Sequence, residues 1–408
     1  MARAYDVVVF GATSFVGELI CQYLMSRARE EGLSWALAGR SQEKLSALRE
    51  RLGPEAAELP LIVADAHDDA ALRALVAQGR VILSSVGPYA LYGEPLIRAC
   101  VEAGVDYCDL TGEVQWMRAM LERYEVTAQA SGARVVHCCG FDSIPSDLGL
   151  MELQRLAQER FGAYCERVTY RLKAAQGGFS GGTVASLLNV SEELSRNPKL
   201  RKLLADPYAL CVGFEKPQTR QPNVTGPTFD EDHQAWLAPF VMASINTRVV
   251  QRSHALLGRP YGAHFQYDEA TLMGSGLKGR LAASGMSAGL GVFLGATALA
   301  PTRALLKRFV LPAPGEGPSP EAQESGFFDV RFLGHTASGE RVALKVTGDR
   351  DPGYGSTAKM ISEAAFCLAT EGSSQERVGG FWTPSTLLGP ALLERLQTYA
   401  GLSFKALD

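Results

Sequence analysis

Strongly apolar stretches and amphipathic stretches alternate regularly over residues 5–141 of the chain. The apolar stretches carry Val, Ile and Leu on successive positions, which is typical of strands buried on both faces of a parallel sheet. They lie at 5–10, 34–40, 59–65, 80–87, 105–110 and 133–141. Helical spacing of apolar residues is found between them, at 17–31, 42–52, 68–78, 94–104 and 113–130. This order predicts an α/β fold with a doubly wound parallel sheet of the Rossmann type.

The pattern changes after residue 141, where longer strands with period-two alternation are expected. These strands are predicted at 167–176, 264–274, 326–337 and 340–348, and Ser338-Gly339 predicts a hairpin between the last two. Helices are expected at 183–197, 239–257, 356–370 and 385–401. The Pro/Gly-rich segment 311–326 is expected to be an exposed connector. A second, α+β domain with an antiparallel sheet is therefore predicted.

Composition excludes several classes of protein. The 408 residues include 40 Lys+Arg and 44 Asp+Glu, so the net charge of -4 argues against nucleic acid as a partner. Eight scattered cysteines without CxxC spacing indicate free thiols in a reducing compartment. The six histidines show neither HxxxH nor HExxH spacing, so no metal site is expected. No signal peptide is recognised at the N-terminus, and a cytoplasmic location is expected.

One uncharged segment, 281–302, is long enough to approach the thickness of a bilayer. Its Gly and Ala content gives it little apolar area, so we expect a helix that does not span a membrane. Three alternatives stay open for its surface: a substrate cavity, an interface in a homodimer, or a lipid surface. Arg280, Arg303, Lys307 and Arg308 flank it, which is why peripheral membrane contact is expected through 281–308 in the third case.

The clearest chemical signal is the loop between the first strand and the first helix. Glycines at its start and end allow a tight turn and close approach to a pyrophosphate, and the helix N-terminus favours an anion. Ser14 stands where the middle glycine is usual. The loop residues expected to bind the cofactor are Gly11, Thr13, Ser14, Phe15, Val16 and Gly17.

The end of the second strand discriminates between cofactors. NAD-binding domains carry an acidic residue there, which accepts from the ribose 2′-OH, whereas this chain has Arg40. A guanidinium suits the 2′-phosphate of NADP, and Ser41 and Lys44 follow it closely. We therefore predict NADP as the cofactor. Asp65, which ends the third strand, is a candidate for contact with the adenine, although a solvated strand end is the alternative.

The path from the pyrophosphate toward the nicotinamide is expected to follow the end of the fourth strand. The residues predicted there are Ser85, Val86, Gly87 and Pro88.

Several longer motifs run from one end of the chain to the other. They are GATSFVG, AGRSQEKL, VGPYALYGEPLIRACVEAGVDYCDLTGE, GFDSIPSDLG, SGGTVAS, PGEGPSPE and GDRDPGYGSTAKM. In these motifs the chain resembles the saccharopine dehydrogenase-like oxidoreductases, and within them the trans-acting enoyl reductases. The resemblance implies an NADP-binding Rossmann domain, a second α+β domain, and reduction of a carbon–carbon double bond in lipid-like substrates.

Candidate catalytic residues lie after the strands, where ligands bind in such sheets. Tyr89 is the best-placed acid after the fourth strand, and a packing aromatic is its alternative. Asp142 follows the sixth strand, where a hinge or helix cap is the alternative to catalysis. Asp109 and Glu113 are expected to hold loop backbone. The loop at 177–183 is either a docking point for a substrate carbonyl or a connector.

Together these features predict an NADP-dependent oxidoreductase that reduces a hydrophobic acyl or lipid-like substrate. The alternatives are a reductase of a polar, amino-acid-type substrate and a non-enzymatic NADP-binding scaffold at a lipid surface. We expect an NADP-binding domain at 1–141 and a substrate or dimerisation domain at 142–350. The helices of 351–408 are expected to pack back on either domain.

Overall fold

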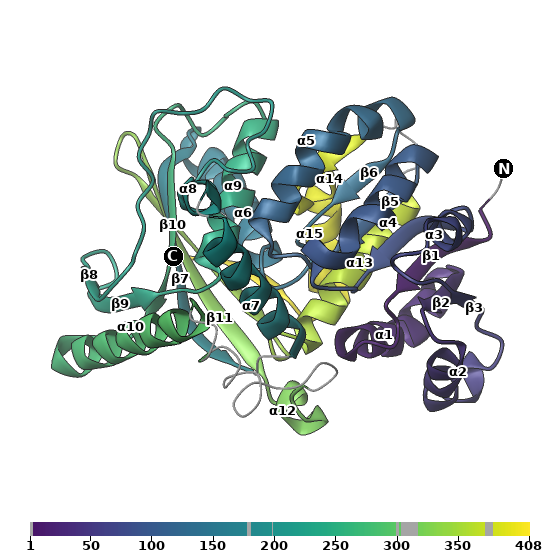
Figure 1. Ribbon diagram of the computed structural model, residues 1–408. Coiled ribbons are helices and arrows are strands. Elements are labelled where there is room, and N and C mark those ends of the chain that lie inside the picture. The colour runs from purple at the N-terminus through teal and green to yellow at the C-terminus, as the bar shows by residue number, and fades with distance from the viewer. Residues whose placement is uncertain (1–2, 178–180, 198, 299–301, 303–316, 372–377) are drawn as a thin grey trace.

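The computed structural model describes residues 3–408 except 178–180, 198, 299–301, 303–316 and 372–377. Two seven-stranded sheets are present, one in the half of the molecule that holds the N-terminus and one in the opposite half (Figure 1). The first sheet carries the candidate cofactor site. The second sheet and its helices make up most of the other half of the molecule.

All strand pairs of the first sheet are parallel, in the order β13-β6-β5-β4-β1-β2-β3. Its strands are β1 (Tyr5–Phe10), β2 (Trp35–Gly39), β3 (Leu61–Val63), β4 (Gly79–Ser84), β5 (Asp106–Asp109), β6 (Arg134–Val136) and β13 (Gly380–Trp382). The connecting helices are α1 (Phe15–Glu31), α2 (Gln42–Arg51), α3 (Asp69–Val76), α4 (Tyr89–Ala103) and α5 (Val114–Ser131). A short 3-10 turn, η1 (Pro54–Ala56), precedes β3. The predicted doubly wound sheet is confirmed.

Alternate residues of β1 explain why the sequence reads as a continuous apolar run. Val7 and Val9 belong to a core shared with α1 and α2, whereas Val8 and Phe10 belong to a core shared with α3, α4 and α5. Both faces of the strand are therefore removed from water, as expected of a strand in a doubly wound sheet.

The second sheet is mostly antiparallel, in the order β14-β12-β11-β7-β10-β9-β8. Its strands are β7 (Cys165–Gln176), β8 (Thr228–Asp230), β9 (Ala235–Pro239), β10 (Gln266–Leu272), β11 (Phe327–Thr336), β12 (Arg341–Gly348) and β14 (Ser403–Leu407). Only the β7–β10 pair is parallel among these described strands. The predicted hairpin is confirmed, because β11 and β12 pair in register and Gly339 adopts a φ of 95° in the turn.

The second half holds more helices than the pattern predicted. They are α6 (Ile144–Phe161), α7 (Gly181–Arg196), α8 (Lys199–Ala205), α9 (Ala243–Leu256), α10 (Gly276–Ala298) and α12 (Pro320–Glu324). The helix expected at 239–257 begins at Ala243, because Pro239 ends β9, which pairs with β8 and β10. Within the expected connector 311–326, residues 311–316 lie outside the described part, and α12 forms a short helix further on.

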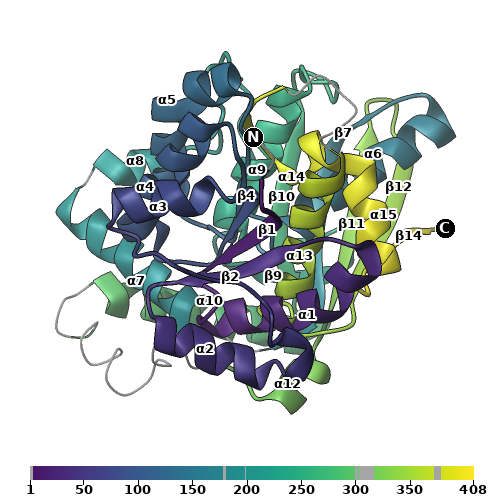
Figure 2. The ribbon, with the colours of Figure 1, turned by 90° about the vertical axis from the view of Figure 1, so that its right-hand side faces the viewer.

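The C-terminal segment contributes to both sheets. Helix α13 (Gly355–Glu371) packs on β1, β4 and β5, and β13 adds to the first sheet beside β6. Helices α14 (Pro384–Leu387) and α15 (Gly389–Thr398) pack on α6, and β14 adds to the second sheet beside β12 (Figure 2). The boundaries expected at 141 and 350 stay a prediction.

Candidate functional site

The loop between β1 and α1 fits closely against the residues that follow β4. Gly11 has a φ of 90°, and a Cβ on it would lie 2.7 Å from both Ser85 Oγ and Val86 Cγ2. A Cβ on Gly17 would lie 2.2 Å from the carbonyl oxygen of Gly11. Both positions therefore require glycine. The first turn of α1 lies directly against the loop backbone, which is the arrangement that presents helix N–H groups to a pyrophosphate.

Ser14 has a role within the protein. Its Oγ accepts a hydrogen bond from the Gly17 N–H at 3.0 Å, so Ser14 is the N-cap of α1. The same oxygen lies 3.0 Å from Ser85 Oγ, and Ser85 in turn donates to the Gly11 carbonyl oxygen at 3.1 Å. The two serines thus join the loop after β1 to the loop after β4. Donation from Ser14 to a phosphate stays a prediction.

Other loop residues connect the site to distant parts of the chain. Thr13 lies beside the end of β2, since a Cβ on Gly39 would be 3.8 Å from Thr13 Oγ1. The Phe15 ring meets the Tyr354 ring edge-on at a centroid distance of 5.1 Å. The next residue, Val16, is half-buried and packs against the core. Segments that the sequence places about 340 residues apart therefore meet at this loop.

Two cations near the end of β2, one just after the strand and one in the first turn of α2, have no carboxylate partner among the described residues. Arg40 and Lys44 are exposed, and no acidic side chain in the described part of the chain pairs with either. Ser41 Oγ accepts from the Lys44 N–H at 3.3 Å and so caps α2. Asp65 is exposed, and its Oδ1 accepts from the His67 N–H at 2.9 Å in the turn after β3. Arg40 and Lys44 are thus available to an anion.

The residues after β4 lead from the loop toward the second half of the chain. Ser85 is buried, Val86 and Pro88 are half-buried, and Gly87 is exposed. A Cβ on Gly87 would lie 3.9 Å from Ser186 Oγ of α7. This stretch therefore runs between the loop that joins β1 to α1 (residues 11–17, hereafter the glycine loop) and α7.

Tyr89 is held by backbone on both sides. Its hydroxyl donates to the Ser84 carbonyl oxygen and accepts from the Leu110 N–H, each at 3.1 Å. Its ring is buried and packs on Trp116, and burial raises the pKa of its hydroxyl well above the ordinary value. The helix predicted from Glu94 begins at Tyr89, so this residue stands in the first turn of α4. This geometry favours the packing alternative over the role of an acid.

Glu113 caps that first turn of α4 from a neighbouring loop. Its carboxylate accepts from the N–H groups of Tyr89 and Ala90 at 2.8 and 2.9 Å, and Ser186 donates to it at 2.9 Å. Burial raises the pKa of Glu113, while the backbone donors oppose the rise. Glu113 was expected to hold backbone, but its contact with α7 could not be foreseen from local sequence.

Asp142 stands out among the carboxylates at the ends of the strands. Within the described residues, no cation or hydrogen-bond donor contacts its carboxylate. A Cβ on Gly112 would lie 3.7 Å from Asp142 Oδ2, so the carboxyl lies beside the loop after β5. Asp142 is half-buried, and the desolvation of its carboxyl raises its pKa to about 6. By contrast, Asp109 accepts from the N–H groups of Thr111 and Cys138 and lies 2.7 Å from His137 Nδ1.

The loop that carries Asp142 is anchored by its neighbour. Ser143 donates to Asn246 Oδ1 of α9 at 3.2 Å, and Asn246 donates to Glu269 Oε2 at 2.8 Å. Tyr267 donates to the other oxygen of Glu269 at 2.8 Å. Burial raises the pKa of Glu269 to about 7. This buried chain of hydrogen bonds fixes the position from which Asp142 projects.

The second-half loop at 177–183 is only partly described, because 178–180 lie outside the described residues. Helix α7 begins at Gly181, and a Cβ on Gly177 would lie 2.9 Å from Pro352 Cδ. The role of this loop in docking a substrate stays a prediction.

Of six basic residues in the second half that were candidates for binding a dicarboxylate, three are held by partners within the described part of the chain. The residues in question are Arg171, Lys173, Arg248, Arg252, Lys278 and Arg280. Arg171 is buried between Asp230 and Asp268, each at 2.7 Å. Arg248 and Arg252 donate to backbone carbonyl oxygens. These three guanidinium groups already have partners within the protein.

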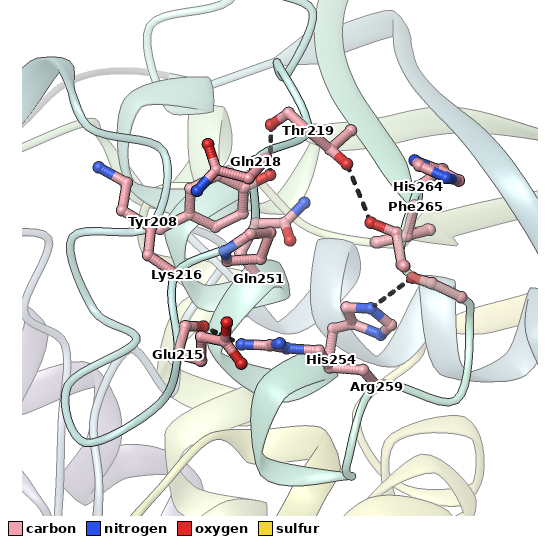
Figure 3. A pocket seen from close by; sticks show the side chains of 13 residues that line it. Tyr208, Glu215, Lys216, Gln218, Thr219, Gln251, His254, Arg259, His264 and Phe265 are labelled. Atoms are coloured by element: carbon pink, nitrogen blue, oxygen red, sulfur yellow. Dashed lines mark hydrogen bonds between the residues drawn. The ribbon is translucent and has the colours of Figure 1, made fainter.

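A cavity of about 430 Å³ lies apart from the glycine loop, at the C-terminal end of α9 (Figure 3). Tyr208, Gln218, Gln251 and Phe265 are among its lining residues, and none of the predicted cofactor residues lines it. His254 also faces it; burial lowers the pKa of this side chain to about 4, so the ring is neutral near pH 7. Among the described residues, no group of three or more His, Cys, Asp or Glu side chains could hold a metal ion.

Comparison with known proteins identifies the family. Residues 7–136 match the model of the saccharopine dehydrogenase NADP-binding domain. A putative trans-acting enoyl reductase of Mycobacterium tuberculosis is 40% identical over 414 residues, which cover 99% of this chain and 97% of the relative. The chain belongs to the saccharopine dehydrogenase-like oxidoreductases, in the group of the trans-acting enoyl reductases. Its cofactor is NADP.

Further relatives agree with this assignment. A trans-acting enoyl reductase of Mycobacterium bovis is 37% identical over 407 residues, covering 97% of this chain and 96% of that protein. The apo saccharopine dehydrogenase (L-Glu forming) of Saccharomyces cerevisiae has a TM-score of 0.55 and 13% identity, covering 99% of this chain and 100% of that chain. The yeast structure shows that the two-sheet fold is shared.

Proposed function

We propose that the chain is an NADPH-dependent reductase of a carbon–carbon double bond in a hydrophobic acyl substrate. The observation that carries this proposal is Asp142, a carboxyl at the ends of the parallel strands with a pKa raised to about 6 and no ion-pair partner among the described residues. Reduction of an enoyl group needs a proton for the α-carbon. A carboxyl with a raised pKa is suited to supply it near neutral pH.

The fit of the cofactor follows from the chain's own residues. Gly11 and Gly17 keep the loop free of side chains where a pyrophosphate approaches, and Arg40 and Lys44 offer charge to a 2′-phosphate. The remaining residues proposed to hold it are Thr13, Ser14, Phe15, Val16, Ser41, Asp65, Ser85, Val86, Gly87 and Pro88. NADPH, when bound, supplies a hydride.

Asp142 would protonate the substrate, while Ser143 holds its loop in place through Asn246. Tyr89 and Glu113 would shape the wall of the site, since each is bound to backbone. An apolar substrate is favoured over an amino acid because a dicarboxylate requires convergent free cations. Arg171, for example, is already paired with two aspartates.

The test is product analysis with purified protein, NADPH and enoyl thioesters of increasing acyl length. In D₂O with unlabelled NADPH, the expected product gains one deuterium, at the α-carbon, because the proton comes from an exchangeable carboxyl. Imines formed from glutamate and an aldehyde are offered in parallel with NADPH, and saccharopine is offered with NADP⁺, as polar substrates. Turnover of those alone contradicts the acyl assignment, and NADPH binding without any reduced product supports a scaffold.

A further inference from the structure

Helix α10 exposes large apolar side chains on its outward side. The three most exposed of them, Leu277, Leu281 and Val292, are 71%, 63% and 73% exposed, and on an ideal helix they fall within a sector of about 60°; Met286 and Leu294, at 43% and 44%, lie toward other sides of the helix. The buried Ala283 and Thr297 lie roughly opposite, where α10 packs against β9 and α7. The outward side of a helix on a protein surface is normally polar. On α10, the helix at the lower left of Figure 1, this side is apolar, which points to a partner.

Cations lie along both edges of this apolar sector. Lys278 and Arg280 are exposed and fall on either side of Leu277 and Leu281 around the helix. The sequence has no Asp or Glu from Ala270 to Gly315, whereas this stretch carries five basic residues. An apolar stripe bordered by cations matches an anionic lipid surface, since the long basic side chains reach the headgroups while the stripe enters the acyl boundary.

The helix does not have the character of a membrane span. No helix within the described ranges is long and apolar enough to cross a bilayer. Four glycines of α10 are open, because a Cβ on Gly285, Gly289, Gly291 or Gly295 would meet nothing within 4 Å. No described element therefore packs closely against these four positions.

We propose that α10 is a membrane-docking surface that lies flat in the headgroup layer of an anionic bilayer. Leu277, Leu281 and Val292 enter the acyl boundary, and Lys278 and Arg280 contact lipid phosphates. A second copy of the chain is the less favoured occupant, because α10 offers no acidic side chain to the cations of a partner helix. This proposal does not depend on the reaction that the protein catalyses.

The experiment is flotation of the full chain with large unilamellar vesicles. Vesicles of phosphatidylcholine with phosphatidylglycerol are compared with vesicles of phosphatidylcholine alone. We expect binding to the anionic vesicles only, and a loss of about tenfold or more in the Leu281→Asp/Val292→Asp variant. The Lys278→Glu/Arg280→Glu variant should bind more weakly as well, and added salt should weaken the wild type.

Val126→Asp is the matched control, because Val126 is 77% exposed on α5 and lies outside the docking surface. It should bind the vesicles as the wild type does, and circular dichroism confirms that each variant is folded. Absence of wild-type binding to anionic vesicles overturns the proposal, as does equal binding by the α10 variants. A wild-type dimer that the Leu281→Asp/Val292→Asp variant converts to a monomer, without vesicle binding, assigns the surface to a second copy.

Discussion

Gly11 and Gly17 are required by the protein's own packing as well as by a cofactor. Valine at position 17 would place its Cβ 2.2 Å from the Gly11 carbonyl oxygen, so this change would move the loop itself. If such a variant lost cofactor binding, the result would not show whether the cause was a blocked phosphate contact or a distorted loop. Exposed side chains such as Arg40 are the better probes, because their replacement leaves the packing intact.

Arg40→Asp should weaken NADPH binding and leave NADH binding unchanged or stronger. The guanidinium is unpaired among the described residues, so its loss removes a charge-assisted contact to the 2′-phosphate and adds repulsion. We expect a loss of about 1.5–3 kcal/mol in NADPH binding free energy, measured by fluorescence titration. Arg29→Asp is the control, since Arg29 is exposed at the far end of α1. Equal wild-type affinity for NADPH and NADH contradicts the assignment of Arg40.

Asp142→Asn should lower the reduction rate by about 10²-fold or more and remove its dependence on pH near 6. The folded pKa is raised from 3.8 to about 6, so the proton-donating form is populated below pH 6. The wild-type kcat/KM should therefore fall as pH rises through about 6. Steady-state kinetics between pH 5 and 9 check this, and a pH-independent rate in the wild type speaks against Asp142.

Two controls separate catalysis by Asp142 from a structural role. A raised folded pKa means that Asp142 stabilises the fold least when it is ionised, so Asp142→Asn should be at least as stable as the wild type at pH 8. Tyr89→Phe should cost about 1–3 kcal/mol of stability, because it leaves the Leu110 N–H without its acceptor. If the Tyr89→Phe variant were as stable as the wild type but inactive, Tyr89 rather than Asp142 would be the proton donor.

At the scale of elements, a buried ion-pair network joins the first and last helices of the chain. Glu363 of α13 is fully buried and accepts from Tyr23 and Arg27 of α1 at 2.6 and 3.2 Å. It also accepts from Arg395 of α15 at 2.8 Å, and Glu31 pairs with both arginines. These contacts fix α13 and α15 against α1. The N-terminus of α1 in turn adjoins the glycine loop.

Glu363→Ala should destabilise the protein by about 3–5 kcal/mol, because it leaves two guanidinium groups partly unpaired near the interior. The urea midpoint should fall correspondingly. Glu394→Ala is the control, since Glu394 is exposed on α15, and it should change stability by less than about 0.5 kcal/mol. A Glu363→Ala variant with wild-type stability would show that the network adds nothing to this contact.

The helices and strands that could be predicted from the sequence are those that depend on the local pattern of apolar and polar residues. The alternation of apolar runs and helical spacing located β1 to β6 and α1 to α5, and the turn at Gly339 located the hairpin. Strand β13 escaped prediction because three residues, Gly380–Trp382, become a strand only by pairing with β6. The desolvation of Asp142 and the contact between Ser186 and Glu113 likewise depend on parts of the chain that are distant in sequence.

At the scale of the whole molecule, the two sheets share one core. Leu148 and Leu153 of α6 belong to the same buried cluster as Val81 and Leu83 of the first sheet. Helix α13 supplies Met360, Ile361 and Leu368 to that cluster, and it covers the face of β1, β4 and β5 that the helices α3 to α5 do not. A cofactor-binding domain cut at residue 141 would therefore expose one apolar face of its sheet to water.

This arrangement predicts that residues 1–141 alone do not fold cooperatively. The isolated fragment should show no sharp urea transition by circular dichroism and should not bind NADPH, because the face of β4 that carries Val81 and Leu83 lacks its cover. Joining residues 351–385 to the fragment through a flexible linker returns α13 and β13, and should restore both a sharp transition and NADPH binding. Joining 385–408 instead is the matched control: α15 meets the fragment at α1 through the Arg395–Glu31 pair, but the cover over β4 and β5 comes from α13, and β14 belongs to the second sheet. If 1–141 unfolds sharply by itself and binds NADPH as tightly as the full chain, the first sheet is independent and α13 is only an addition to it.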